Sequence, residues 1–168
     1  MRYYLLVVMF LCLSCSRKSA EQLYEEGIKA ENDKQYQVAV DNFKEIVDKY
    51  DNTPLADSAM YRLALVYNND LHETQNAVST YQRYCQKYPS SPRAATALFL
   101  AAFLMNNDLH QLDSARLAYE KFLQLYPQHE LAQSAKFELA NLGKDPGEFV
   151  TQKPAEQSLT SQPVTPSK

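Results

Sequence analysis

The chain is poor in the residues from which many catalytic and nucleotide-binding sites are built. Its 168 residues include no tryptophan, three glycines and three cysteines. No GxGxxG or GxxxxGK[ST] motif occurs, so we expect no glycine-rich loop around a phosphate. Asn-Gly, Asp-Gly and Gly-Gly pairs are missing as well, which leaves few signals for β-hairpins. The net charge of −3 gives no global preference for nucleic acid.

The first residues, MRYYLLVVMFLCLSC, place a short apolar run behind a single arginine. The run is too short to cross a bilayer core of about 30 Å and is typical of a secretory signal peptide. Its end, Leu13-Ser14-Cys15, resembles the bacterial lipobox, in which the cysteine is acylated and becomes the first mature residue. We therefore expect a signal peptide over 1–14, lipidation at Cys15 and a linker over 15–19. Cleavage without lipid, near Ser14 or Ser16, is the alternative.

The remaining cysteine and the C-terminal region predict little chemistry. Cys85 is alone once Cys12 leaves with the signal and Cys15 carries lipid, so no internal disulfide is expected. Its place in an apolar helical pattern predicts a small buried side chain. Residues 144–168 are rich in Pro, Ser, Thr and Gln and poor in large apolar residues, which predicts a disordered tail.

A spacing of 38 residues organises the middle of the chain. A fixed period between 20 and 50 residues indicates a repeat architecture. Within each period, apolar residues recur at the spacing of an amphipathic helix. The positions in step include Ala39, Ala77 and Ala115; Phe43, Tyr81 and Tyr119; Tyr50, Tyr88 and Tyr126; and Ala64, Ala102 and Ala140.

The pattern predicts an all-α fold over 20–143. Pro89 and Pro127 follow a tyrosine and disfavour helical dihedrals at it, so they mark helix ends. Gly143 is expected to cap the last helix. The seven helices are expected at about 20–33, 35–50, 54–68, 73–88, 92–106, 111–126 and 129–142, as three pairs and a closing helix.

These residues resemble the tetratricopeptide repeat (TPR), which combines small residues, an aromatic and a closing proline in a helix pair. Gly27, Tyr36, Ala39 and Phe43 carry the resemblance in the first repeat, and Ala64, Ala77, Tyr81 and Pro89 in the second. Ala102, Ala115, Tyr119 and Pro127 carry it in the third. The lengthened repeats with Tyr-Pro endings resemble those of bacterial envelope TPR lipoproteins. Two kinds are the outer-membrane barrel-assembly lipoprotein BamD and the Tol–Pal-associated periplasmic TPR protein.

The pentapeptide NNDLH occurs twice, at 68–72 and 106–110, between the two helices of a pair. Asn tolerates the left-handed conformation in which many helices end. Asp70 and Asp108 each precede a Glu or Gln by three residues, which predicts a capping box at the next helix. A shared metal site is not expected. Each copy supplies only two ligand types, and one helix spacing of roughly 8–10 Å separates them.

The resemblance implies a right-handed solenoid whose first helices line a groove for a peptide. The candidate groove residues are Tyr24, Ile28, Tyr61, Leu65, Asn68, Phe99, Phe103 and Asn106. The groove lacks the cations with which TPR clamps hold a terminal carboxylate, so an apolar or amphipathic segment is expected. Tyr61 and Phe99 have an equally good alternative as core residues packed against neighbouring helices.

The leading hypothesis is a membrane-anchored scaffold lipoprotein, resembling BamD, that binds barrel-assembly components or unfolded barrel proteins. Alternatives are a Tol–Pal or peptidoglycan-coordination protein and a secreted soluble TPR adaptor. No Ser-His-Asp set, paired inward carboxylates or HExxH motif supports catalysis, so no catalytic residue, metal or cofactor is expected. Ser16 stands where inner-membrane lipoproteins carry Asp, so the resemblance implies the periplasmic face of the outer membrane.

Overall fold

The computed structural model describes residues 17–144, and every regular element in that range is a helix. The predicted signal peptide, Cys15 and nearly all of the predicted tail lie outside the described residues. The helices are α1 (Ala20–Asn32), α2 (Tyr36–Lys49), α3 (Pro54–Leu65), α4 (Thr74–Lys87), α5 (Ala94–Asn107), α6 (Leu112–Leu125) and α7 (Ala132–Ala140). A π-helical turn, η2 (Val66–Asp70), continues α3.

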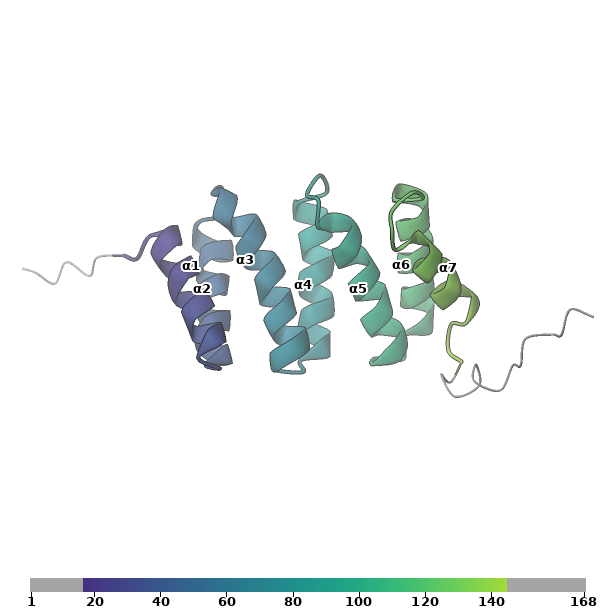
Figure 1. The fold of residues 1–168 in the computed structure, drawn as a ribbon, viewed down its shortest axis with the longest axis horizontal. Coiled ribbons are helices and arrows are strands. Elements are labelled where there is room, and N and C mark those ends of the chain that lie inside the picture. The colour runs from purple at the N-terminus through teal and green to yellow at the C-terminus, as the bar shows by residue number, and fades with distance from the viewer. Residues whose placement is uncertain (1–16, 145–168) are drawn as a thin grey trace, which may run out of the picture.

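The helices form two layers in one row, as Figure 1 shows: α1, α3, α5 and α7 lie in front of α2, α4 and α6. Each helix packs against the next along the chain, and α1 also meets α3. This arrangement confirms the predicted all-α, TPR-like solenoid with seven helices. The observed helices start and stop within about three residues of the predicted ends. No helix among residues 17–144 is long and apolar enough to cross a membrane.

The repeating small and aromatic residues lie where the helices of a pair cross. Ala39, Ala77 and Ala115 are buried in the second helix of each pair. One turn further on, a fully buried aromatic fills the space between the layers. The aromatics are Phe43, Tyr81 and Tyr119. Close helix approach at the alanines and volume at the aromatics together give the densely packed core that periodicity predicted.

At Gly27, α1 packs tightly against Phe43 of α2. A Cβ added there would lie 2.6 Å from Cε1 of Phe43, inside any normal contact distance. The next two pairs carry Ala64 and Ala102 at the corresponding place, and both are fully buried. The first pair is thus packed one methyl group tighter than the two that follow.

The two NNDLH segments form matching turns between α3 and α4 and between α5 and α6. His72 and His110, and not the asparagines, adopt the left-handed conformation, with φ of 54° and 52°. The backbone N–H of Glu73 donates to the Tyr67 carbonyl at 2.8 Å, and that of Gln111 donates to the Met105 carbonyl at 2.7 Å. These wide turns satisfy helix-end carbonyls with backbone donors.

The predicted capping boxes at these turns are wrong. The N-cap residues of α4 and α6 are Glu73 and Gln111. Neither of these side chains makes a cap hydrogen bond. Asp70 ends η2 and Asp108 directly follows α5, so both belong to the helix before the turn and lie three residues ahead of the N-cap position of the next helix. A capping box does form elsewhere: Ser19 and Gln22 cap α1 reciprocally.

Candidate functional site

The predicted groove residues lie on α1, α3 with η2, and α5, three helices of the front layer in Figure 1. We call the surface of these helices the front face. Phe103 is its most open member, with 37% of its surface exposed, whereas Asn106 is buried. The other six predicted residues are partly buried: Tyr24, Ile28, Tyr61, Leu65, Asn68 and Phe99.

Tyr61 and Phe99 each belong to both the core and the surface. The Tyr61 ring meets the rings of Tyr81 and Tyr84 edge-on, with centroids 6.0 Å and 5.4 Å away. Phe99 makes the same two contacts one repeat later, with Tyr119 at 5.8 Å and Phe122 at 5.9 Å. One side of each ring therefore closes the helix pair while the remainder stays accessible.

The front face changes character along the solenoid. Arg62 of α3 forms an ion pair with Glu31 of α1 at 2.8 Å, beside Tyr24. In the third pair, Phe103 stacks on Phe99 with centroids 6.3 Å apart. On the front face, charged side chains therefore lie between the first and second helix pairs, whereas stacked aromatic rings lie at the third pair.

The two predicted groove asparagines differ in their hydrogen bonds. The Asn68 amide donates to Oδ1 of Asn69 at 2.7 Å and stays partly accessible. The Asn106 Oδ1 accepts from the backbone N–H of Gly143 at 3.3 Å, which ties the chain after α7 to the end of α5. Asn106 therefore holds the closing helix, and its amide oxygen is already in use.

A polar cluster that the sequence analysis missed joins the second and third helix pairs. The Tyr84 hydroxyl donates to Asp57 at 2.7 Å and lies 2.6 Å from the Ser91 hydroxyl. Arg93 also donates to Asp57, at 2.8 Å. Burial, and then the Asp57 carboxylate, raise the pKa of Tyr84 to about 12. The cluster keeps its donors and acceptors paired and has the features of a structural clamp rather than of an acid–base pair.

The remaining candidate groups for chemistry are inert or dispersed. Burial raises the pKa of the Cys85 thiol to about 11, so it stays protonated near neutral pH and is a poor nucleophile. Its Sγ donates to the Ala94 carbonyl at 3.4 Å, and the residue is half-buried as part of a helix contact. Within residues 17–144, no group of three or more His, Cys, Asp or Glu side chains is placed to hold a metal ion.

Paired helices, alanine contacts and a partly accessible aromatic face define a TPR-type α-solenoid, a class of protein that binds other proteins along an extended surface. A family model for YfiO, described as an outer membrane lipoprotein, matches residues 16–144. The match covers well over half of the chain, which therefore belongs to this family of outer membrane lipoproteins, and its place is the cell envelope. The expected envelope TPR lipoprotein resembling BamD is thereby confirmed. No curated protein matches the chain closely enough to count as a relative.

Proposed function

We propose that the protein is a non-enzymatic scaffold, anchored through acylated Cys15 on the periplasmic face of the outer membrane. Its front face holds apolar or amphipathic protein segments. The observation that carries the proposal is the match to an outer membrane lipoprotein family over the whole solenoid. The half-exposed aromatic residues of α3 and α5 support it, because such residues supply most of the binding energy in protein interfaces.

The contacts of the first described residues support a position of the solenoid close to the membrane. The Tyr50 hydroxyl donates to the Lys18 carbonyl at 2.5 Å, and the Arg17 guanidinium stands 5.9 Å from the centre of the same ring. Arg17 and Lys18 of the predicted linker therefore lie against the residue that follows α2. Only Ser16 separates Arg17 from Cys15, so the first helix pair would stand within about 10 Å of an acyl anchor.

The finer proposal is a role in outer-membrane β-barrel assembly, with barrel-assembly components or unfolded barrel proteins as partners. The apolar part of the front face, at the third helix pair, suits a segment with bulky apolar side chains, as unfolded barrel strands have. A Tol–Pal or peptidoglycan-coordination role is the alternative within the same fold.

Photo-crosslinking from the front face tests the function directly. A photoreactive phenylalanine analogue replaces Phe103 in the full-length protein in intact cells, and adducts are identified by mass spectrometry. Barrel-assembly proteins or unfolded barrel proteins are expected. The same analogue at Lys44, exposed on α2, is the matched control. Adducts with Tol, Pal or peptidoglycan enzymes would move the assignment to the alternative, and equal yields at both positions would refute front-face binding.

The anchor has its own test. Cys15→Ala is expected to transfer the protein from the membrane fraction to the soluble periplasmic fraction, because the residue that carries the lipid is lost. Cys85→Ala is the matched control and should leave the distribution unchanged. Unaltered detergent-phase partitioning of Cys15→Ala would show that the chain is held by something other than this acyl group.

A further inference from the structure

Two seams between helices of the back layer invite comparison, because the repeat places equivalent residues in both. The first seam lies between α2 and α4, and the second seam lies between α4 and α6 above Leu98 of α5. Two ion pairs cross the first seam: Arg83 with Asp48 at 3.6 Å, and Lys87 with Asp51 at 3.2 Å. Paired charges therefore bridge the first seam on its solvent-exposed side.

The second seam keeps the cation of that pattern and loses the acids. The positions equivalent to Arg83 and Asp48 hold Lys121 and Gln86, and no ion pair within residues 17–144 includes Lys121. The position equivalent to Lys87 holds Leu125, which is 53% exposed. Leu117, at the position of Ser79, is 66% exposed. An apolar stripe with one uncompensated cation therefore replaces a band of paired charges.

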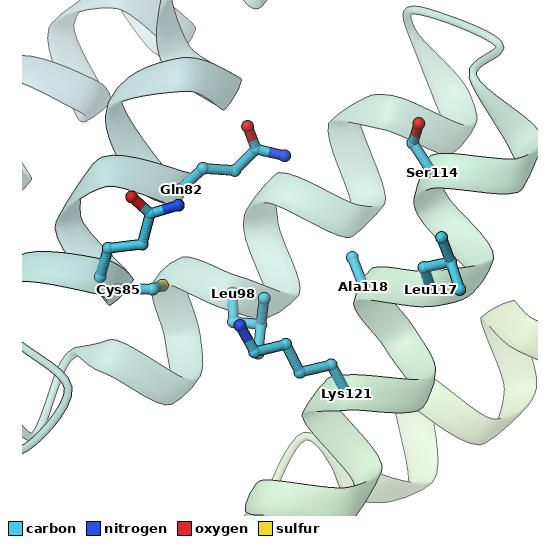
Figure 2. A pocket seen from close by; sticks show the side chains of 8 residues that line it. Gln82, Cys85, Leu98, Ser114, Leu117, Ala118 and Lys121 are labelled. Carbon is cyan, nitrogen blue, oxygen red and sulfur yellow. The ribbon is translucent and has the colours of Figure 1, made fainter.

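The second seam is also hollow. Cys85, Leu98 and Ala118 line a pocket of about 360 Å³ between α4 and α6. At the equivalent places the first seam has Val47, Met60 and Thr80. Val47 is buried where Cys85 is half-buried, whereas Met60 and Leu98 are both buried. Figure 2 shows the Lys121 side chain reaching from α6 toward Leu98, with Gln82 and Cys85 on the facing side. No carboxylate is among the residues that line this pocket.

We propose that the second seam is a docking site for a partner protein's acidic amphipathic helix. The helix lays leucine-like side chains against Leu117 and Leu125 and sets a carboxylate against Lys121. Leu117 and Leu125 are eight residues apart, about two helical turns, so both face the same way. A carboxylate is the missing half of the pair that crosses the first seam, and an apolar side chain fits the pocket above Leu98. This site belongs to the back layer and is separate from the front face.

The test uses residues 16–168 and a fluorescein-labelled, blocked helical peptide of alanine, leucine and glutamate, with leucines at helical spacing. The wild-type chain is expected to bind this peptide, and more weakly the peptide in which glutamine replaces glutamate. Leu117→Asn with Leu125→Asn should weaken binding roughly tenfold, because two docked leucines are lost. Both positions are exposed, so the fold should survive, and a thermal melt checks it.

Charge variants separate a specific site from general stickiness. Gln86→Asp restores the acid found in the first seam and should weaken binding of the acidic peptide roughly threefold. Lys121→Glu should reverse the preference in favour of a lysine-containing peptide. Arg83→Gln and Val38→Asn, one a cation and one an exposed apolar residue outside the second seam, are the matched controls and should change nothing.

Three outcomes would overturn the proposal. One is binding that ignores the Leu117, Leu125 and Lys121 variants. Another is binding that Phe103→Ala abolishes while those variants do not, which would place the peptide on the front face. The third concerns the chain's own Glu148 and Phe149. If Glu148→Gln with Phe149→Ala strongly tightens peptide binding, the chain's own C-terminal residues, and not a partner, fill the second seam.

Discussion

The first helix pair and the two pairs that follow share one plan and differ in three ways. At the helix crossing, Gly27 meets Phe43, whereas the later pairs have Ala64 with Tyr81 and Ala102 with Tyr119 at the corresponding positions. At the inter-helix turn, the Gln35 N–H donates five residues back to Ala30, whereas the NNDLH turns close over six. On the front face, an ion pair lies between the first and second pairs, whereas stacked aromatic rings lie at the third pair. A repeat fixes the packing scheme and leaves surfaces and turns free to diverge.

The strongest test of this comparison replaces Gly27 of the first pair with alanine, the residue that the other two pairs have at this place. Gly27→Ala is expected to lower the free energy of unfolding by about 1–2 kcal/mol. Overpacking against Phe43 costs about 1–3 kcal/mol, and removing a helical glycine returns up to about 1 kcal/mol. Urea denaturation monitored by circular dichroism measures it. Adding Phe43→Leu should recover most of the loss, and a Gly27→Ala protein more stable than wild type would show that the pair is not tightly packed.

The converse change gives the later pairs the aromatic of the first. The hydroxyls of Tyr81 and Tyr119 are buried, and no group among the described residues hydrogen-bonds to them. Tyr81→Phe and Tyr119→Phe should therefore each raise stability by about 1 kcal/mol, since an unsatisfied buried hydroxyl carries a desolvation cost. Tyr84→Phe, one turn from Tyr81 on α4, is the matched control. Its hydroxyl bonds Asp57 and Ser91, so its loss should lower stability by about 1 kcal/mol.

The sequence predicted the core because core positions follow a simple rule. Residues such as Ala77 and Tyr81 recur every 38 positions, and burial follows helical periodicity. The NNDLH turns were misread because an Asp three residues before Glu or Gln is the same pattern whether the Asp starts the second helix or, as Asp70 and Asp108 do, ends the first. The form of each turn depends on which carbonyl of the first helix accepts the N–H that precedes the second helix. The side chains in the turn do not indicate which carbonyl that is.

The surfaces were partly predictable for a different reason. TPR resemblance places Tyr61 and Phe99 on the front face, but it does not say how much of each ring the next helix covers. Comparing the repeats with each other could have identified the second seam, because Leu125 stands where Lys87 does one period earlier. Whether the acid opposite each cation is close enough to pair, as Asp48 is to Arg83, needs coordinates.

The contrast along the front face predicts unequal contributions to partner binding. With a photoreactive residue at Leu65, Phe103→Ala should reduce adduct yield about fivefold, because it removes an aromatic contact worth about 1 kcal/mol. Ile28→Ala, at the corresponding place in the first pair, should have a smaller effect beside the Arg62–Glu31 pair. Both variants should keep a melting temperature close to that of the wild type. Equal losses would mean that the face binds evenly along its length.

The turns give the smallest expected effect and the most direct reading of local geometry. His72→Gly and His110→Gly should each raise stability by about 0.5–1 kcal/mol, because glycine adopts positive φ without the steric penalty of a Cβ. Lys34→Gly should give a similar gain, since Lys34 has a φ of 60° in the shorter turn. By contrast, Asp108→Ala should change stability little, because Asp108 does not cap α6. A loss near 1 kcal/mol for Asp108→Ala, measured by urea denaturation, would restore the capping role that the sequence indicated.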